Sequence, residues 1–91
     1  MKLKNWEVIT DYCGHNYYLR GNVYGNPKFE DGRCVATSRI VEIIDKGSYK
    51  EAITKSKSVY ELHSEDVDKG AERRSPHYYE RLKFEDLKEL V

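Results

Sequence analysis

The sequence predicts a mainly β protein, a single small domain of five or six short strands in a bent sheet or small barrel with a C-terminal helix. Apolar and polar side chains alternate along at least three segments, which is the pattern of strands with one buried face. Turn residues separate these segments at short intervals. Because a chain of 91 residues forms a single hydrophobic core, residues 1–91 are expected to be one domain.

Two predicted strands at the start of the chain form a hairpin. The first covers residues 5–12, and the second covers residues 17–24. Cys13-Gly14-His15-Asn16 lies between them as the turn. Gly25-Asn26-Pro27 ends the second strand, because proline has no amide hydrogen for a ladder. The expected buried face of the first strand is made by its even positions, Trp6, Val8, Thr10 and Tyr12.

The third predicted strand runs from Arg33 to Ile44, after a tight turn at Asp31-Gly32. The polar triplet Thr37-Ser38-Arg39 interrupts it, which predicts a bend or bulge within the strand. After the triplet, residues 40–44 are almost continuously apolar, which predicts burial on both faces.

Two more short strands are expected over residues 49–54 and 58–63, joined by the polar turn Lys55-Ser56-Lys57. Residues 64–75 have few side chains to bury and are expected to form a mobile loop or a weak helical turn. Residues 77–83 fit a sixth strand and a helix equally well. The predicted C-terminal helix is amphipathic and has its apolar side chains at helical spacing: Phe84, Leu87, Leu90 and Val91.

Composition excludes several classes of partner. Lys plus Arg and Asp plus Glu both total 16, and a net charge of zero argues against binding to a DNA or RNA duplex. The sequence has neither a signal peptide nor a long apolar run, so no membrane association and a cytoplasmic location are expected, with Cys13 and Cys34 reduced. A small polar domain has little room for a ligand cavity of roughly 300 Å³ or more, so a pocket shared between subunits of a homo-oligomer is expected.

The spacing of the cysteine, histidine and glycine residues matches no motif for metal binding or catalysis. Cys13 and His15 are two residues apart, which does not match the paired spacing of structural zinc ligands. The same two residues resemble a thiol and its base, but no third group is visible to orient the histidine. The glycines match no phosphate-binding loop. The prediction is a protein that is not an enzyme and that carries no metal or cofactor.

Arginines interleaved with aromatic and hydroxyl side chains indicate a phosphorylated, base-containing ligand. Guanidinium groups bind phosphate in a bidentate manner, and aromatic faces stack on bases. The alternative is that these arginines are solvated surface residues paired with some of the acidic side chains. The predicted ligand-binding residues are Arg20, Phe29, Thr37, Ser38, Arg39, Arg73, Arg74 and Tyr78.

Residues 18–41, YLRGNVYGNPKFEDGRCVATSRIV, carry a resemblance to a known family. A strand is followed by G-x-V-x-G, then by a Phe-x-Asp-Gly turn, then by Thr-Ser and aliphatic residues. This order is similar to small phage-encoded proteins, above all to the Thoeris anti-defence type 1 sponges. The resemblance implies an oligomeric, β-rich phage protein that sequesters a small cyclic nucleotide immune signal in the host cytoplasm without cleaving it.

A second function fits the same sequence, namely a small protein-interaction module or a phage inhibitor that binds a host protein. The two functions need different surfaces. A nucleotide sponge needs convergent arginine and aromatic side chains in a concave site, whereas an interaction module needs an exposed apolar patch with a polar rim.

Overall fold

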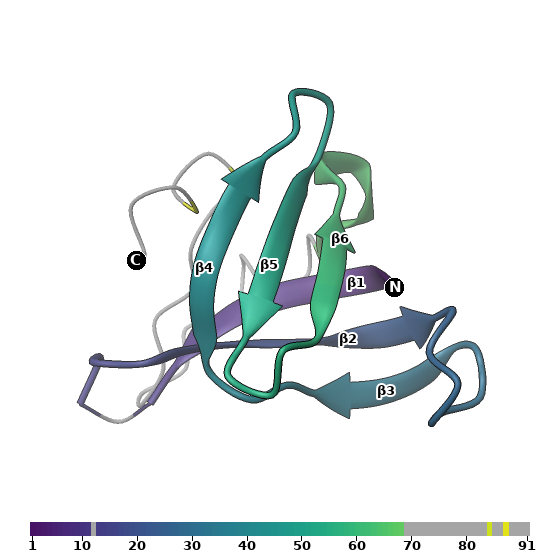
Figure 1. The fold of residues 1–91 in the computed structure, drawn as a ribbon, viewed down its shortest axis with the longest axis horizontal. Coiled ribbons are helices and arrows are strands. Elements are labelled where there is room, and N and C mark those ends of the chain that lie inside the picture. The colour runs from purple at the N-terminus through teal and green to yellow at the C-terminus, as the bar shows by residue number, and fades with distance from the viewer. Residues whose placement is uncertain (12, 69–83, 85–86, 88–91) are drawn as a thin grey trace.

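The computed structural model describes residues 1–11, 13–68, 84 and 87, and it confirms a mainly β single small domain. These residues form one open, mixed sheet of six strands (Figure 1). In chain order the strands are β1 (Lys2–Thr10), β2 (Tyr17–Tyr24), β3 (Arg33–Ala36), β4 (Ile40–Asp45), β5 (Lys50–Thr54) and β6 (Val59–Leu62).

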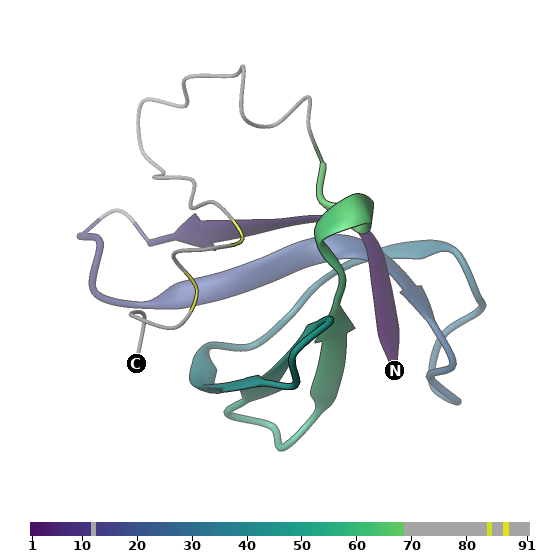
Figure 2. The same cartoon turned by 90° about the horizontal axis from the view of Figure 1, so that it is seen from above.

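The spatial order of the strands is β3-β2-β1-β6-β5-β4. Neighbouring strands are antiparallel except at the centre, where β1 runs parallel to β6. Two antiparallel units of three consecutive strands therefore meet along one parallel seam. Figures 1 and 2 show the strands of the two units at a steep angle to each other, so the sheet is strongly bent.

A β-bulge interrupts β1 at Asn5 and Trp6, which together lie opposite Gly21 of β2. Asn5 has φ of 49°, in the left-handed region that asparagine tolerates better than most residues. The extra residue reverses the alternation of the strand, so Leu3 and Trp6 are both fully buried although one position is odd and the other even. The predicted buried face is confirmed at Trp6, Val8 and Thr10 and missed Leu3, while Tyr12 lies outside the described residues.

The core lies on the concave side of the bent sheet and draws on both three-stranded units. Trp6 is its largest fully buried side chain, and its ring lies 6.1 Å from that of Phe84, between centroids. Burial of this apolar area is the main stabilising term in a domain this small. The buried hydrophobic residues are Leu3, Trp6, Val8, Leu19, Val23, Ile40, Ala52, Tyr60, Leu62 and Leu87.

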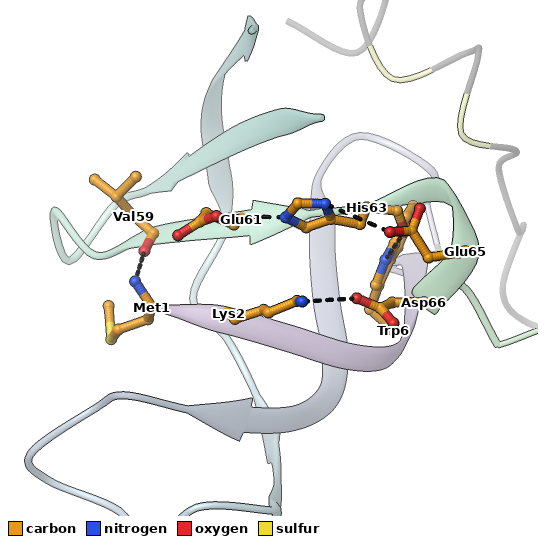
Figure 3. Close-up of polar contacts among 8 residues, drawn as sticks. All are labelled: Met1, Lys2, Trp6, Val59, Glu61, His63, Glu65 and Asp66. Carbon is orange, nitrogen blue, oxygen red and sulfur yellow. Dashed lines mark hydrogen bonds and ion pairs between the residues drawn. The ribbon is translucent and has the colours of Figure 1, made fainter. Parts of the chain in front are cut away.

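The parallel seam is held by backbone pairing at the start of the chain (Figure 3). Lys2 pairs with Glu61 of β6, and the Glu61 N–H donates to the Met1 carbonyl at 2.7 Å. Beside them, the Lys2 ammonium lies 3.7 Å from a carboxylate oxygen of Asp66, which follows β6 in the 3-10 turn Ser64–Asp66.

Trp6 and His63 join the seam farther along β1. The Trp6 indole N–H donates to the His63 carbonyl at 3.0 Å (Figure 3). Trp6 also forms a parallel bridge with Val67. The His63 ring stacks on Tyr49 at 4.9 Å between centroids, and its two nitrogens lie near carboxylates of Glu61 and Glu65. The chain after β6 therefore continues along β1 instead of leaving the sheet.

The prediction of one bent strand from Arg33 to Ile44 is wrong. Its two halves, β3 and β4, lie at opposite edges of the sheet. Thr37 closes β3, because its N–H donates to the Leu19 carbonyl at 2.8 Å and its hydroxyl accepts the Leu19 N–H at 3.0 Å. The polar triplet is thus a link between edges rather than a bend.

The rest of that link is attached to the turn between β5 and β6. The Ser38 hydroxyl hydrogen bonds with the Ser56 hydroxyl at 3.1 Å, and the Arg39 carbonyl accepts the Lys55 N–H at 2.8 Å. These contacts turn the chain from one three-stranded unit into the other. Hydroxyl groups suit such a connection, because they can hydrogen bond with backbone N–H and C=O groups that have no partner strand there.

Burial of residues 40–44 on both faces is also wrong, since β4 is an edge strand. Val41 is 42% exposed and is the extra residue of a second bulge, between Ile40 and Glu42. Only Ile40 is fully packed in the core, with Ile43 partly buried against it. A continuous apolar run can arise in an edge strand as well as in a central one, so composition alone could not decide.

The described residues include only part of the C-terminal third, so only some of the predictions for it are tested. Residues 64–68, the start of the predicted mobile loop, are a 3-10 turn and a bridge to β1. The described residues contain no α-helix, so the predicted C-terminal helix has no counterpart among them. Residues 69–83, 85–86 and 88–91, on which the rest of these predictions fall, lie outside the described residues.

The turn between β1 and β2 depends on the carboxylate of Asp11. Asp11 accepts hydrogen bonds from the Asn16 amide at 2.8 Å and from the His15 N–H at 3.0 Å. The Asn16 bond, followed by backbone N–H groups, holds the pKa of Asp11 below its ordinary value of 3.8.

We expect this turn to stabilise the fold fully above pH 3.8 and to lose that contribution as the pH falls through the lowered pKa. The check is an NMR titration of the Asp11 carboxyl carbon. Asn16→Ala should raise the midpoint toward the ordinary value. An Asp11 midpoint that Asn16→Ala leaves unchanged would show that the amide does not hold the charge.

Candidate functional site

The candidate site lies on the outer face of the first three-stranded unit, opposite the core. Between the core-facing positions of β2, Arg20 and Asn22 point to the other side of the sheet. Cross-strand pairing places Glu7 of β1 beside Arg20, and Cys34 of β3 beside Asn22. Residues from three strands thus gather on one face because their registers align.

The bulge in β1 and the chain after β6 complete a pocket. The Asp68 N–H donates to the Trp6 carbonyl at 2.8 Å, which holds Asp68 next to the bulge at Asn5. The resulting concave site has a volume of about 420 Å³. This size is within the range of small-molecule sites, which is roughly 300–1,000 Å³. The pocket is lined by Asn5, Glu7, Arg20, Gly21, Asn22, Cys34 and Asp68.

An ion pair fixes the charged part of the pocket. Arg20 Nε lies 3.5 Å from Glu7 Oε1, with the arginine side chain 53% exposed and the glutamate side chain 6% exposed. A carboxylate this buried needs a cationic partner, because an uncompensated charge out of water is costly. Glu7 therefore anchors the guanidinium at its Nε, while much of the arginine remains open to solvent.

The pocket offers a mixed set of polar groups. Glu7 and Asp68 supply carboxylate acceptors, and Asn5 and Asn22 supply amides that both donate and accept. Arg20 supplies donors in a planar fork. Cys34 adds a solvent-exposed thiol at the wall formed by β3.

Of the predicted ligand-binding residues, Arg20 alone lines this pocket among those that the structure describes. Phe29 precedes β3 and packs against Arg33, whose guanidinium carbon is 5.7 Å from the ring centroid. Thr37 and Ser38 follow β3 and are used in the link to β4. Phe29 and the Thr37-Ser38-Arg39 triplet therefore flank opposite ends of β3 and do not converge.

Arg73, Arg74 and Tyr78 lie outside the described residues, so their predicted contacts with a ligand stay predictions. Most residues of the pocket, including Asn5, Asn22 and Asp68, were not predicted from the sequence. The register of the predicted hairpin could have placed Glu7 beside Arg20, because hairpin turns set cross-strand pairs. A bulge at Asn5 and the return of Asp68 to β1 leave no comparable signal in the sequence.

Metal-ligand clusters and membrane-spanning helices are both absent from the described part of the chain. No group of three or more His, Cys, Asp or Glu side chains there is placed to hold a metal ion. Among the described helical segments, none is long and apolar enough for a membrane crossing.

The described residues of a single copy form this open, concave site, while the expectation of a pocket shared between subunits stays a prediction. Comparison with known proteins adds nothing to this geometry. No family model, no curated protein and no solved structure matches the chain. The likeness to anti-defence sponges therefore rests on residues 18–41 alone and remains a prediction.

Proposed function

We propose that this protein binds a small nucleotide-type signal molecule in the outer-face pocket and sequesters it without turnover. The observation that supports this most is the set of groups around one concave site: a half-exposed arginine, two amides and two carboxylates. Each matches one part of a nucleotide. Guanidinium binds phosphate, carboxylates accept from ribose hydroxyls, and amides pair with base edges.

Charge determines how such a ligand would lie. The pocket has one cation and two anions, Glu7 and Asp68, so its centre disfavours a bare phosphate. Lys4, which pairs with Asn22, adds a second cation beside the pocket. We therefore infer that the nucleoside occupies the pocket and that the phosphate lies toward Arg20 at its solvent side. A cyclic nucleotide, with its reduced phosphate charge, suits this balance better than a free triphosphate.

Arg20→Ala is expected to weaken nucleotide binding by about 1.5–3 kcal/mol, the scale of a hydrogen bond to a charged group. The measurement is calorimetry with the tightest ligand from a thermal-shift screen of cyclic nucleotides. In that screen a ligand at 100 times its dissociation constant stabilises the fold by about 2.7 kcal/mol. Arg39→Ala provides the comparison, because Arg39 is exposed and does not line the pocket.

The pair of variants separates three outcomes. Loss with Arg20→Ala alone supports the pocket. Loss with Arg39→Ala alone would move the ligand to the link between β3 and β4. A screen in which no nucleotide raises the unfolding temperature would contradict the proposal and favour the protein-interaction alternative.

The two cysteines allow the site to be mapped directly. Both are exposed thiols, but only Cys34 lines the pocket, while Cys13 lies in the turn between β1 and β2. In Cys13→Ser protein, bound ligand should slow the reaction of Cys34 with a thiol reagent. In the matched Cys34→Ser protein, the rate at Cys13 should not change. Mass spectrometry of the recovered ligand tests whether the protein releases the ligand chemically unchanged.

A further inference from the structure

The two edges of the sheet differ in how well they are protected against pairing with another strand. On β4, the bulge at Val41 disrupts the ladder, and Glu42 and Asp45 add charge. These are features that keep natural edge strands from pairing. On β3, the register with β2 is regular, and its last three residues, Cys34-Val35-Ala36, are uncharged. Among the residues that the structure describes, β3 therefore presents the more open edge.

Backbone directions on β3 follow from its contact with β2. The Thr37 N–H donates to the Leu19 carbonyl, so Thr37 faces β2. Because successive residues in a strand direct their N–H and C=O groups to opposite sides, Val35 also faces β2. The N–H and C=O groups of Cys34 and Ala36 therefore point toward the open edge.

We propose that β3 pairs antiparallel with β3 of a second copy of this chain, around a twofold axis at Val35. In this register Cys34 of each copy lies opposite Ala36 of the other. The pairing therefore contains two such Cys34–Ala36 pairs, one at each end of the contact. In each pair the two residues exchange two backbone hydrogen bonds. A twofold arrangement of this kind uses the same surface on both subunits and closes as a dimer.

The charges around β3 fit a second copy in this register. Asp31 and Arg39 lie at equal distances in sequence on the two sides of Val35, and both are exposed. Both lie beyond the ends of β3, in the turn before it and in the link after it. Antiparallel pairing about Val35 places the start of each β3, which follows Asp31, beside the end of the other, which leads to Arg39. Opposite charges near the two ends of the paired strands are favourable at long range, and the twofold symmetry repeats the arrangement.

The pairing surface is small, since β3 has only four residues. A contact of this size falls well below the roughly 1,200–2,000 Å² of stable interfaces, so the dimer is expected to dissociate on dilution. The outer faces of the two copies align in one continuous sheet. Their pockets would open on the same side, although the dimer does not depend on any ligand.

Disulfide trapping suits a weak dimer. In Cys13→Ser protein, Ala36→Cys places a new thiol opposite Cys34 of the second copy. Hydrogen-bonded antiparallel pairs have Cα atoms about 5.5 Å apart, which is within disulfide range. Mild oxidation should yield a covalent dimer linked between positions 34 and 36, as read by peptide mapping. Cys13→Ser protein without the second substitution should cross-link far more slowly, because Cys34 then faces Ala36.

Sedimentation of uncross-linked protein gives an independent test. Ala36→Pro removes an N–H that the dimer uses and that the ladder with β2 does not. By symmetry two hydrogen bonds are lost, so the dimer dissociation constant should rise about tenfold or more. Ala36→Thr keeps the N–H and should leave that constant nearly unchanged. A monomer at all concentrations, or a dimer that is insensitive to Ala36→Pro, would overturn the proposal, as would cross-links at other positions.

Discussion

Trp6→Ala is expected to leave the chain close to unfolded. The Trp6 side chain is fully buried, and its indole N–H donates to the His63 carbonyl at 3.0 Å. Removal of a buried tryptophan costs about 3–5 kcal/mol. Small domains often have a free energy of unfolding near the lower end of the usual range, which is about 5–15 kcal/mol. The loss should therefore consume most of the stability, as read by urea unfolding followed by circular dichroism.

Trp6→Phe separates the ring from the hydrogen bond. Phenylalanine keeps much of the apolar volume but leaves the His63 carbonyl without its indole donor. That variant should cost less than Trp6→Ala, because it keeps most of the buried ring and the His63 carbonyl still accepts the Asp66 N–H at 3.0 Å. Only the indole hydrogen bond is lost, which contributes about 0.5–1.5 kcal/mol. If Trp6→Ala shifted the urea midpoint no more than Trp6→Phe, the ring would not be central to the core.

Gly21→Ala is expected to lower the unfolding temperature by more than about 10 °C. A Cβ at this position would lie 2.9 Å from the Lys4 carbonyl oxygen and 3.0 Å from Trp6 Cα, both backbone atoms of the bulged strand. Backbone cannot rotate away as a side chain can, so the cost should reach about 3 kcal/mol, the upper end for overpacking. In a domain of this size each kcal/mol corresponds to about 4–8 °C.

Gly47→Ala provides the contrast for that prediction. Gly47 has φ of 93°, but a Cβ there would meet nothing within 4 Å. Its cost is conformational only, about 1–2 kcal/mol. Gly21→Ala should therefore be the more damaging substitution, although alanine suits a strand better than glycine. A Gly21→Ala protein as stable as the parent would mean that β1 is not bulged over β2.

Much of the sheet could be predicted from the sequence, because alternation and turn residues act locally. Both β1–β2 and β5–β6 are hairpins as expected, and their turns lie where Gly14 and Lys55-Ser56-Lys57 indicated. Placement of β3 and β4 at opposite edges was not predictable in the same way. It depends on the hydrogen bond that Thr37 N–H donates to the Leu19 carbonyl and on the one that the Arg39 carbonyl accepts from Lys55 N–H. These partners are distant in sequence, so no local pattern specifies them.

The candidate site was less predictable than the sheet, and for a related reason. Arg20 was identified because a guanidinium in a strand is conspicuous in the sequence. Glu7, its partner, resembled any surface acid until the hairpin register brought the two within 3.5 Å. Asp68 belongs to the pocket only because the chain after β6 returns to the bulge. Such residues are recruited by topology rather than by local sequence.

The parallel seam between β1 and β6 has a consequence for the time course of folding. Each three-stranded unit pairs strands that are consecutive in the chain, whereas the Trp6–His63 contact joins residues 57 positions apart. Closing so long a loop costs entropy before any contact compensates for it, so the units are expected to form early and to dock late. Seam contacts made after the rate-limiting step mainly slow unfolding. The ion pair of Lys2 with Asp66 forms across this seam, so its loss should raise the unfolding rate more than it lowers the folding rate.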